Sequence, residues 1–181
     1  WELRKALSLL KKGNATLIEW LDSPVVYRAN SAFLAAMHDA IAHTHRAERS
    51  FHHYVHMARK NYREYLNGDT VRLKKYLYVL RPLLATLWIE QGRGAAPMRF
   101  QDLVDAIVTD PALHGAIAEL LVIKRAASES EYGKPLPVIN RFIDQELGRL
   151  ESLRPPVSQE IDYSVLDRIL LATVTITANL L

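Results

Sequence analysis

The chain has 181 residues, 49% of them apolar, and its 23 Lys and Arg residues against 20 Asp and Glu residues give a formal net charge of +3. This length and composition are typical of one globular domain with a hydrophobic core. The sequence contains no cysteine, which excludes a disulfide scaffold, a thiolate nucleophile, an iron–sulfur cluster and a cysteine-based zinc site. A cytoplasmic location fits this composition. The longest charge-free run near either end has 13 residues, fewer than the ~20 that cross a bilayer, so we expect no membrane anchor.

Helical spacing of apolar residues begins at the first residue. It predicts a helix over about 1–12, which Gly13 ends, and a short second helix that Asn14 caps. A third helix is expected from Ser31, and a fourth from the cap Ser50 to about Leu66. Further helices are expected at about 70–90, 99–109, 111–129, 136–152 and 162–179.

No segment shows sustained strand alternation, although the β-branched run Thr173 to Thr177 is compatible with a strand. We therefore expect an all-α fold, a compact bundle of about seven to nine helices that forms a single helical domain over residues 1–181. The Gly- and Ala-rich segment 91–97 is the clearest loop and separates residues 1–90 from the C-terminal helices of 98–181.

Positive charge is concentrated in one stretch. Residues 43–81 hold nine Lys and Arg against three Asp and Glu, a net charge of +6, so the rest of the chain carries −3. Five of the eight tyrosines and five of the seven histidines lie in the same stretch. Cations interleaved with aromatic rings suit a polyphosphate with a stacked base. A solvated basic face is the alternative explanation.

Helical phase indicates which of these residues act together. Lys74, Tyr78 and Arg81 recur at i, i+4 and i+7 and so share one face of the 70–90 helix. Pro82 should leave the Tyr78 carbonyl without its helical donor, free for a base or ribose group. On the partner helix, Asn61 either satisfies buried backbone groups or contacts a ligand. We expect Lys74, Tyr78, Arg81 and Asn61 to form a nucleotide-binding site.

Catalytic and metal motifs are weak in this sequence. His52 and His56 lie at i, i+4, but no carboxylate accompanies them at ligand spacing, so we expect neither a metal site nor catalytic residues in this chain. Nucleophile-elbow glycines and a phosphate-binding Gly-rich loop are absent. Arg46 and His52 match the loose Arg-x5-His pattern of HEPN-type helical ribonucleases.

Three runs of the sequence resemble a known family: WELRKALSLLKKGNATLIEWLDSPVVY (1–27), HHYVHMARKNYREYL (52–66) and VRLKKYLYVLRPLLATLWIE (71–90). They are similar to the part downstream of the catalytic domain in a bacterial family of nucleotidyltransferases of the DNA polymerase β superfamily, some of which are associated with RNA repair. The resemblance covers nearly the whole chain and is strongest over residues 1–90.

The resemblance implies that catalysis and substrate binding lie in different parts of the enzyme. In that family a Gly-Ser turn, an Asp-x-Asp motif and a third Asp hold two Mg2+ ions for attack on an α-phosphate. None of these motifs occurs in this chain, so the catalytic domain is expected upstream of Trp1. The chain is then expected to be the helical nucleotide- or acceptor-binding portion of an enzyme that transfers an NMP group from an NTP, and to be inactive alone.

The expected partners are a nucleoside triphosphate, RNA or another acceptor, and the upstream catalytic domain. A bare apolar face around Trp1 and Trp20 would also favour a homo-oligomer. Two alternatives stay open: a stand-alone helical RNA-binding or HEPN-like RNase module, and an interaction domain whose basic face docks on an acidic partner.

Overall fold

The computed structural model describes residues 2–126, 132–157 and 160–178. Within these residues it contains nine α-helices, one 3-10 helix (η1) and a two-stranded sheet, which confirms the all-α fold. The elements are α1 (Leu3–Lys11), α2 (Ala15–Leu21), α3 (Ser31–Thr44), α4 (Ala47–Tyr65), β1 (Val71–Arg72), η1 (Leu73–Lys75), α5 (Tyr76–Glu90), α6 (Phe100–Ile107), α7 (Pro111–Ala126), β2 (Tyr132–Gly133), α8 (Pro137–Ser152) and α9 (Ser164–Ala178).

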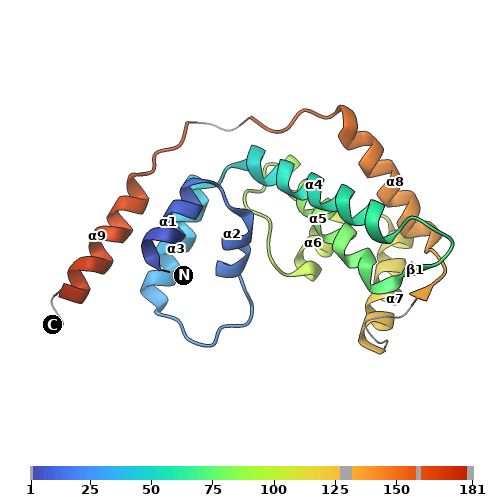
Figure 1. Ribbon diagram of the computed structural model, residues 1–181, viewed down its shortest axis with the longest axis horizontal. Helices are drawn as coiled ribbons and strands as arrows, with labels where there is room; N and C mark the ends of the chain where they lie inside the picture. The colour runs from blue at the N-terminus through green and yellow to red at the C-terminus, as the bar shows by residue number, and fades with distance from the viewer. Residues whose placement is uncertain (1, 127–131, 158–159, 179–181) are drawn as a thin grey trace.

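The helices are arranged as an arch (Figure 1). Helices α1, α2 and α3 lie at one end, α4, α5 and α6 form the middle, and α7 and α8 lie at the other end. The segment after α8 crosses back over the arch, so that α9 lies against α1 and α3. The last helix therefore joins the cluster formed by the first three.

Two hydrophobic clusters hold the arch together. The larger is built around α5, whose Val79, Leu80, Leu83 and Leu84 are fully buried, and α4 makes the most extensive helix–helix contact with it. The smaller cluster is formed by α1, α2, α3 and α9. The expected hairpin of α4 and α5 is thus the centre of the molecule.

The predicted helix ends are correct where the capping chemistry is local. The Asn14 side chain accepts a hydrogen bond from the Leu17 N–H at 2.8 Å, as expected of an N-cap. Gly13 has φ +67°, the left-handed conformation that ends α1. At α3 the cap is Asn30, which accepts from the Phe33 N–H at 3.0 Å, and not Ser31.

Helix α4 begins four residues before the predicted start. Ser50 does not cap it; the side chain is buried inside the first turns and hydrogen bonds to the ring of His45 at 3.0 Å. Arg46 occupies the N-cap position, without a side-chain capping bond. Burial of Ser50 and its bond to His45 therefore take the place of the capping bond expected of this serine.

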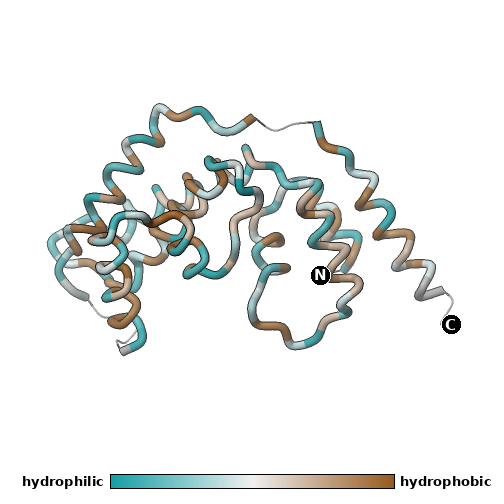
Figure 2. The backbone as a smooth tube through the Cα atoms, turned by 180° about the vertical axis from the view of Figure 1, so that it is seen from behind, coloured by the Kyte–Doolittle hydropathy of each residue, from teal (hydrophilic) through white to brown (hydrophobic). Residues whose placement is uncertain are grey.

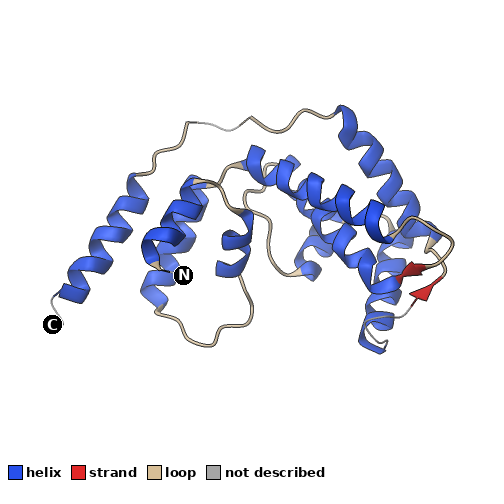
Figure 3. Cartoon of the chain, in the orientation of Figure 1, coloured by secondary structure: helices blue, strands red, loops and turns tan. Residues whose placement is uncertain are grey.

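Helix α5 begins at Tyr76, so the expected helix over 70–90 is too long at its N-terminal end. Val71–Arg72 instead pairs antiparallel with Tyr132–Gly133 (Figure 3). Gly133 suits this pairing, because a Cβ there would lie 2.8 Å from the Leu73 side chain, which would have to move. The predicted helices also extend to residues 127–129 and 179, and the predicted apolar face extends to Trp1. All of these residues lie outside the described ones. The Thr173 to Thr177 run is helical.

Exposed apolar residues gather in the loop between α2 and α3, where brown marks the hydrophobic tip in Figure 2. Val25, Val26 and Tyr27 are 62%, 59% and 97% exposed, and Trp20 precedes them at the end of α2 with 55% exposure. None of the helices that the structure describes is long and apolar enough to span a membrane.

Candidate functional site

The basic stretch forms a cavity of about 240 Å3 where α4, α5 and α7 meet. Lys74, Tyr78 and Arg81 all line it, as their helical phase predicts, although Lys74 lies on η1 and not on α5 itself. The rest of the lining is Met57 from α4, Leu77 and Pro82 from α5, and Lys124 from α7. The cavity therefore combines three cations, one phenol ring and an apolar wall.

Tyr78 is the aromatic group of this cavity and is 52% exposed. The Lys75 Nζ lies 4.3 Å from the Tyr78 ring centroid and 4.4 Å from that of Tyr65, a distance at which a cation is attracted to a π-face. The cation that contacts the Tyr78 ring is thus Lys75, which is not among the predicted site residues.

Arg81 is not an exposed cation. Its Nη1 forms an ion pair with Glu19 of α2 at 2.8 Å, with the two side chains only 22% and 16% exposed. The Glu19 carboxylate also accepts a hydrogen bond from the Tyr54 hydroxyl at 2.6 Å. Burial is the main reason why the pKa of Tyr54 is raised above its usual value, and the Glu19 charge adds to it. These three residues join the two hydrophobic clusters, so Arg81 is a structural residue as well as part of the cavity wall.

Asn61 does not line the cavity. Its Nδ2 donates to the Met57 carbonyl at 2.9 Å and to the Tyr78 carbonyl at 3.2 Å. Pro82 has no N–H for the Tyr78 carbonyl, so Asn61 supplies the missing donor. The expectation that this carbonyl is free for a ligand is wrong. Asn61 acts on the site by fixing the backbone below Tyr78.

The histidines of the basic stretch have separate environments. Burial lowers the pKa of His45 and of His53, and both side chains are partly buried. His52 and His56 are exposed on α4. In the part of the chain that the structure describes, no group of three or more His, Cys, Asp or Glu side chains could hold a metal ion.

Arg46, the first residue of the HEPN pattern, contacts the segment before α9. The Arg46 Nε donates to the Tyr163 hydroxyl at 2.8 Å, and the guanidinium lies 5.7 Å from the Tyr163 ring centroid. Arg46 therefore fastens the segment before α9 to α4. His52, six residues after Arg46, packs edge-on against the adjacent Phe51.

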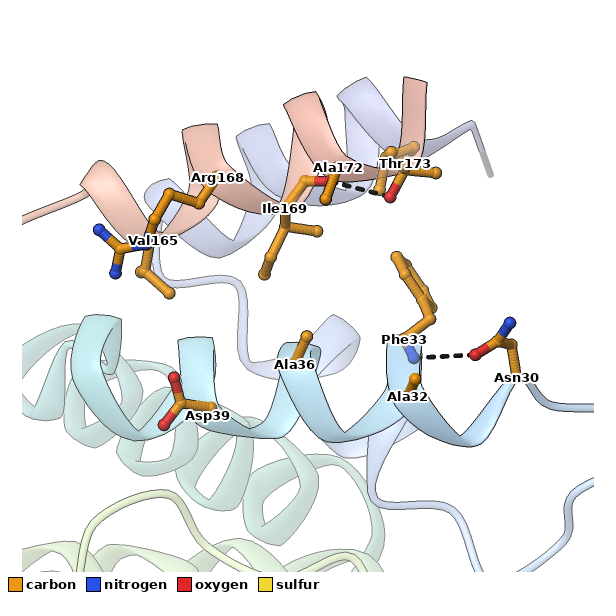
Figure 4. A pocket seen from close by; sticks show the side chains of 11 residues that line it. Asn30, Ala32, Phe33, Ala36, Asp39, Val165, Arg168, Ile169, Ala172 and Thr173 are labelled. Carbon is orange, nitrogen blue, oxygen red and sulfur yellow. Dashed lines mark hydrogen bonds between the residues drawn. The ribbon is translucent and has the colours of Figure 1, made fainter. Parts of the chain in front are cut away.

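A larger cavity of about 680 Å3 lies between α3 and α9 (Figure 4). Phe33 and Ala36 of α3 point toward Val165 and Ile169 of α9 across it. Apart from Arg168 and Asp39 at one end and Asn30 at the other, its lining is mostly apolar. Although it is larger, it is lined by one cation, Arg168, against three in the basic cavity.

Sequence patterns do not indicate two long-range contacts at the site, those made by Glu19 and Lys124. Glu19 is the only charged residue of α2, and Lys124 lies near the end of α7, a basic last turn. Glu19 and Arg81 are more than 40 residues apart in the sequence, and so are Lys124 and Tyr78. No local sequence pattern therefore indicates either contact. Only the packing of α2 and α7 beside α5 reveals them.

The fold and the cavity together define an all-α protein with a cation-lined, aromatic-containing site. Comparison with known proteins adds the family. The model of the RlaP family, described as RNA repair pathway DNA polymerase beta family, matches residues 1–172. The chain belongs to this family, which confirms the resemblance seen in the sequence.

One similar protein is YcgL of Bacillus subtilis (strain 168), described as an uncharacterized protein. The two are 39% identical over 176 residues, which cover 96% of this chain and 68% of YcgL. About a third of YcgL thus lies outside the match. No solved structure matches the chain significantly.

Proposed function

We propose that this chain is the helical, nucleotide-binding portion of a nucleotidyltransferase that transfers an NMP group from an NTP to an acceptor. Membership of the DNA polymerase β-type family supports the reaction class. The observation that carries the proposal is the single cavity that Lys74, Tyr78, Arg81 and Lys124 line together. In the reaction an acceptor oxygen attacks the α-phosphorus of the NTP, and pyrophosphate leaves.

The proposal gives the cavity residues different tasks. Lys74 and Lys124 bind phosphate oxygens through charge-assisted hydrogen bonds, and Tyr78 stacks on the base. Arg81 contributes less to binding than its charge suggests, because Glu19 neutralises it. Asn61 is a positioning residue that holds the Tyr78 backbone.

Mg2+ is part of the proposed reaction but does not fit the residues described here. Metal-assisted phosphoryl transfer needs clustered carboxylates, and the described residues hold no such group. The proposal therefore assigns the metal-binding carboxylates to a catalytic domain outside these 181 residues, and the chain alone should transfer no nucleotide. RNA is one acceptor that the family's description suggests.

Isothermal titration with each of the four NTPs tests the nucleotide site. We expect saturable binding of at least one NTP and a loss of affinity of about 10-fold or more in Lys74→Ala, the usual effect of a charge-assisted hydrogen bond. Lys60→Ala is the matched control, because Lys60 is an exposed lysine of α4 that does not line the cavity. Absence of binding to all four NTPs, or equal affinity in Lys74→Ala and wild type, would contradict the proposal.

A further inference from the structure

A second polar groove, of about 600 Å3, lies between α4 and α8. Its two walls carry opposite charges. His56, Arg59 and Arg63 of α4 form the basic wall, and Asp144 and Glu151 of α8 form the acidic wall. Gly148 of α8 lies between the two carboxylates along the helix and leaves the groove open, because a Cβ there would meet nothing within 4 Å.

The basic wall is a continuous row. His56, Arg59 and Arg63 follow at i, i+3 and i+7, so they share one side of α4 over a rise of about 10 Å. Arg59 Nη2 is buried and has no hydrogen-bond partner among the described residues. A buried guanidinium nitrogen without an acceptor is costly, and a phosphate that drew the Arg59 side chain toward the groove would relieve this cost. The row therefore fits one or two phosphate groups.

The acidic wall is held in place by the protein. Asp144 accepts a hydrogen bond from the Tyr62 hydroxyl of α4. This bond is the main reason why the pKa of Tyr62 is raised to about 12. Glu151 lies two turns along α8 from Asp144, on the same side. The exposed carboxylates of Asp144 and Glu151 would repel a plain polyanion, and they accept hydrogen bonds, so this wall favours a ligand that carries donors such as hydroxyl groups.

We propose that the groove binds a phosphorylated ribose, with its phosphate on Arg59 and Arg63 and its hydroxyls on Asp144 and Glu151. Guanidinium groups bind phosphate bidentately, and carboxylates accept hydrogen bonds from ribose hydroxyls. The 2′-hydroxyl is the group that separates RNA from DNA. The ligand is a ribonucleotide unit, either within an RNA strand or as a free nucleotide. This proposal does not depend on the nucleotide site of Lys74 and Tyr78.

Fluorescence anisotropy tests the groove with a short labelled RNA, the DNA of the same sequence, and unlabelled AMP and dAMP as competitors. We expect RNA to bind more tightly than DNA and Arg59→Gln to weaken RNA binding about 10-fold or more. Asp144→Asn should bring RNA and DNA to similar affinity. If AMP displaces the RNA better than dAMP at comparable concentrations, a free ribonucleotide is the source; if it does not displace it, an RNA strand is.

A steric pair of variants provides the control for folding. Gly148→Phe places a ring in the groove, whereas Gly115→Phe places one on the exposed face of α7, where a Cβ also meets nothing within 4 Å. Gly148→Phe should weaken RNA or AMP binding as much as Arg59→Gln does, and Gly115→Phe should leave it unchanged.

The proposal is overturned if neither RNA nor AMP binds, if RNA and DNA bind wild type equally, or if Arg59→Gln and Gly148→Phe bind as wild type does. Such a result would leave NTP binding through Lys74 untouched, so the two proposals are judged separately.

Discussion

Replacing Glu19 by alanine should lower the free energy of unfolding by about 3 kcal/mol, the effect of removing one partner of a mostly buried ion pair. Glu19 is the acceptor for both Arg81, at 2.8 Å, and the Tyr54 hydroxyl, at 2.6 Å. Without it, the guanidinium and the phenol stay in a mostly buried position and lose their acceptor. We take the lower end of the range for a buried pair because the Glu19 and Arg81 side chains retain 16% and 22% exposure.

Urea denaturation followed by circular dichroism measures this loss. Glu119→Ala is the matched control, because Glu119 is an exposed glutamate of α7. A Glu19→Ala variant as stable as Glu119→Ala would show that the junction of α2, α4 and α5 contributes little. It would also return Arg81 to the role of a ligand-binding cation.

Replacing Tyr76 by phenylalanine should destabilise the chain by about 1–3 kcal/mol, the cost of leaving buried hydrogen-bonding groups unsatisfied. The Tyr76 side chain is fully buried, and its hydroxyl donates to the Asn140 side chain at 2.5 Å and accepts from the Leu136 N–H at 2.9 Å. This hydroxyl therefore ties the start of α5 to the start of α8. Tyr27→Phe, at a 97% exposed loop position, should change stability little.

The same variant has a signature in the pH dependence of stability. Burial raises the pKa of the Tyr76 hydroxyl in the folded state. A group whose pKa is raised on folding stabilises the fold below its unfolded pKa, about 10 for tyrosine, and loses that contribution as the pH rises above it. The wild-type stability should fall above about pH 10, and Tyr76→Phe should make that fall shallower. An identical pH profile for wild type and variant would contradict the buried hydroxyl.

Helical periodicity allowed the sequence to predict the central part of this structure. Tyr78 and Arg81 of α5 line one cavity because spacing along a helix fixes which side chains share a face, and Lys74 joins them from η1, which directly precedes α5. The α4–α5 hairpin and the Asn14 cap follow from similarly local rules.

The errors have a common physical cause, which is contact between distant segments. The Arg81 partner is 62 residues away in the sequence, so its ion pair could not be predicted from phase. The helix predicted from residue 70 begins only at Tyr76, because Val71–Arg72 pairs with Tyr132–Gly133. The Tyr78 carbonyl does lack its helical donor, as Pro82 requires, but the packing of α4 brings Asn61 to it. Local rules therefore identify a group that lacks its usual hydrogen-bond partner, but they do not identify the distant residue that takes the partner's place.

The most direct test of the central claim, that the cavity of Lys74 and Tyr78 binds a nucleoside triphosphate, is photo-crosslinking. The four NTPs, each carrying an azidoanilide on the γ-phosphate, would be irradiated with the 181-residue chain and the labelled peptides identified by mass spectrometry. We expect label on peptides that contain Lys74, Lys124 or Met57, and markedly less in Tyr78→Ala. Label that falls only on other surfaces, such as the α3–α9 cavity or the α4–α8 groove, or that Tyr78→Ala leaves unchanged, would contradict the account.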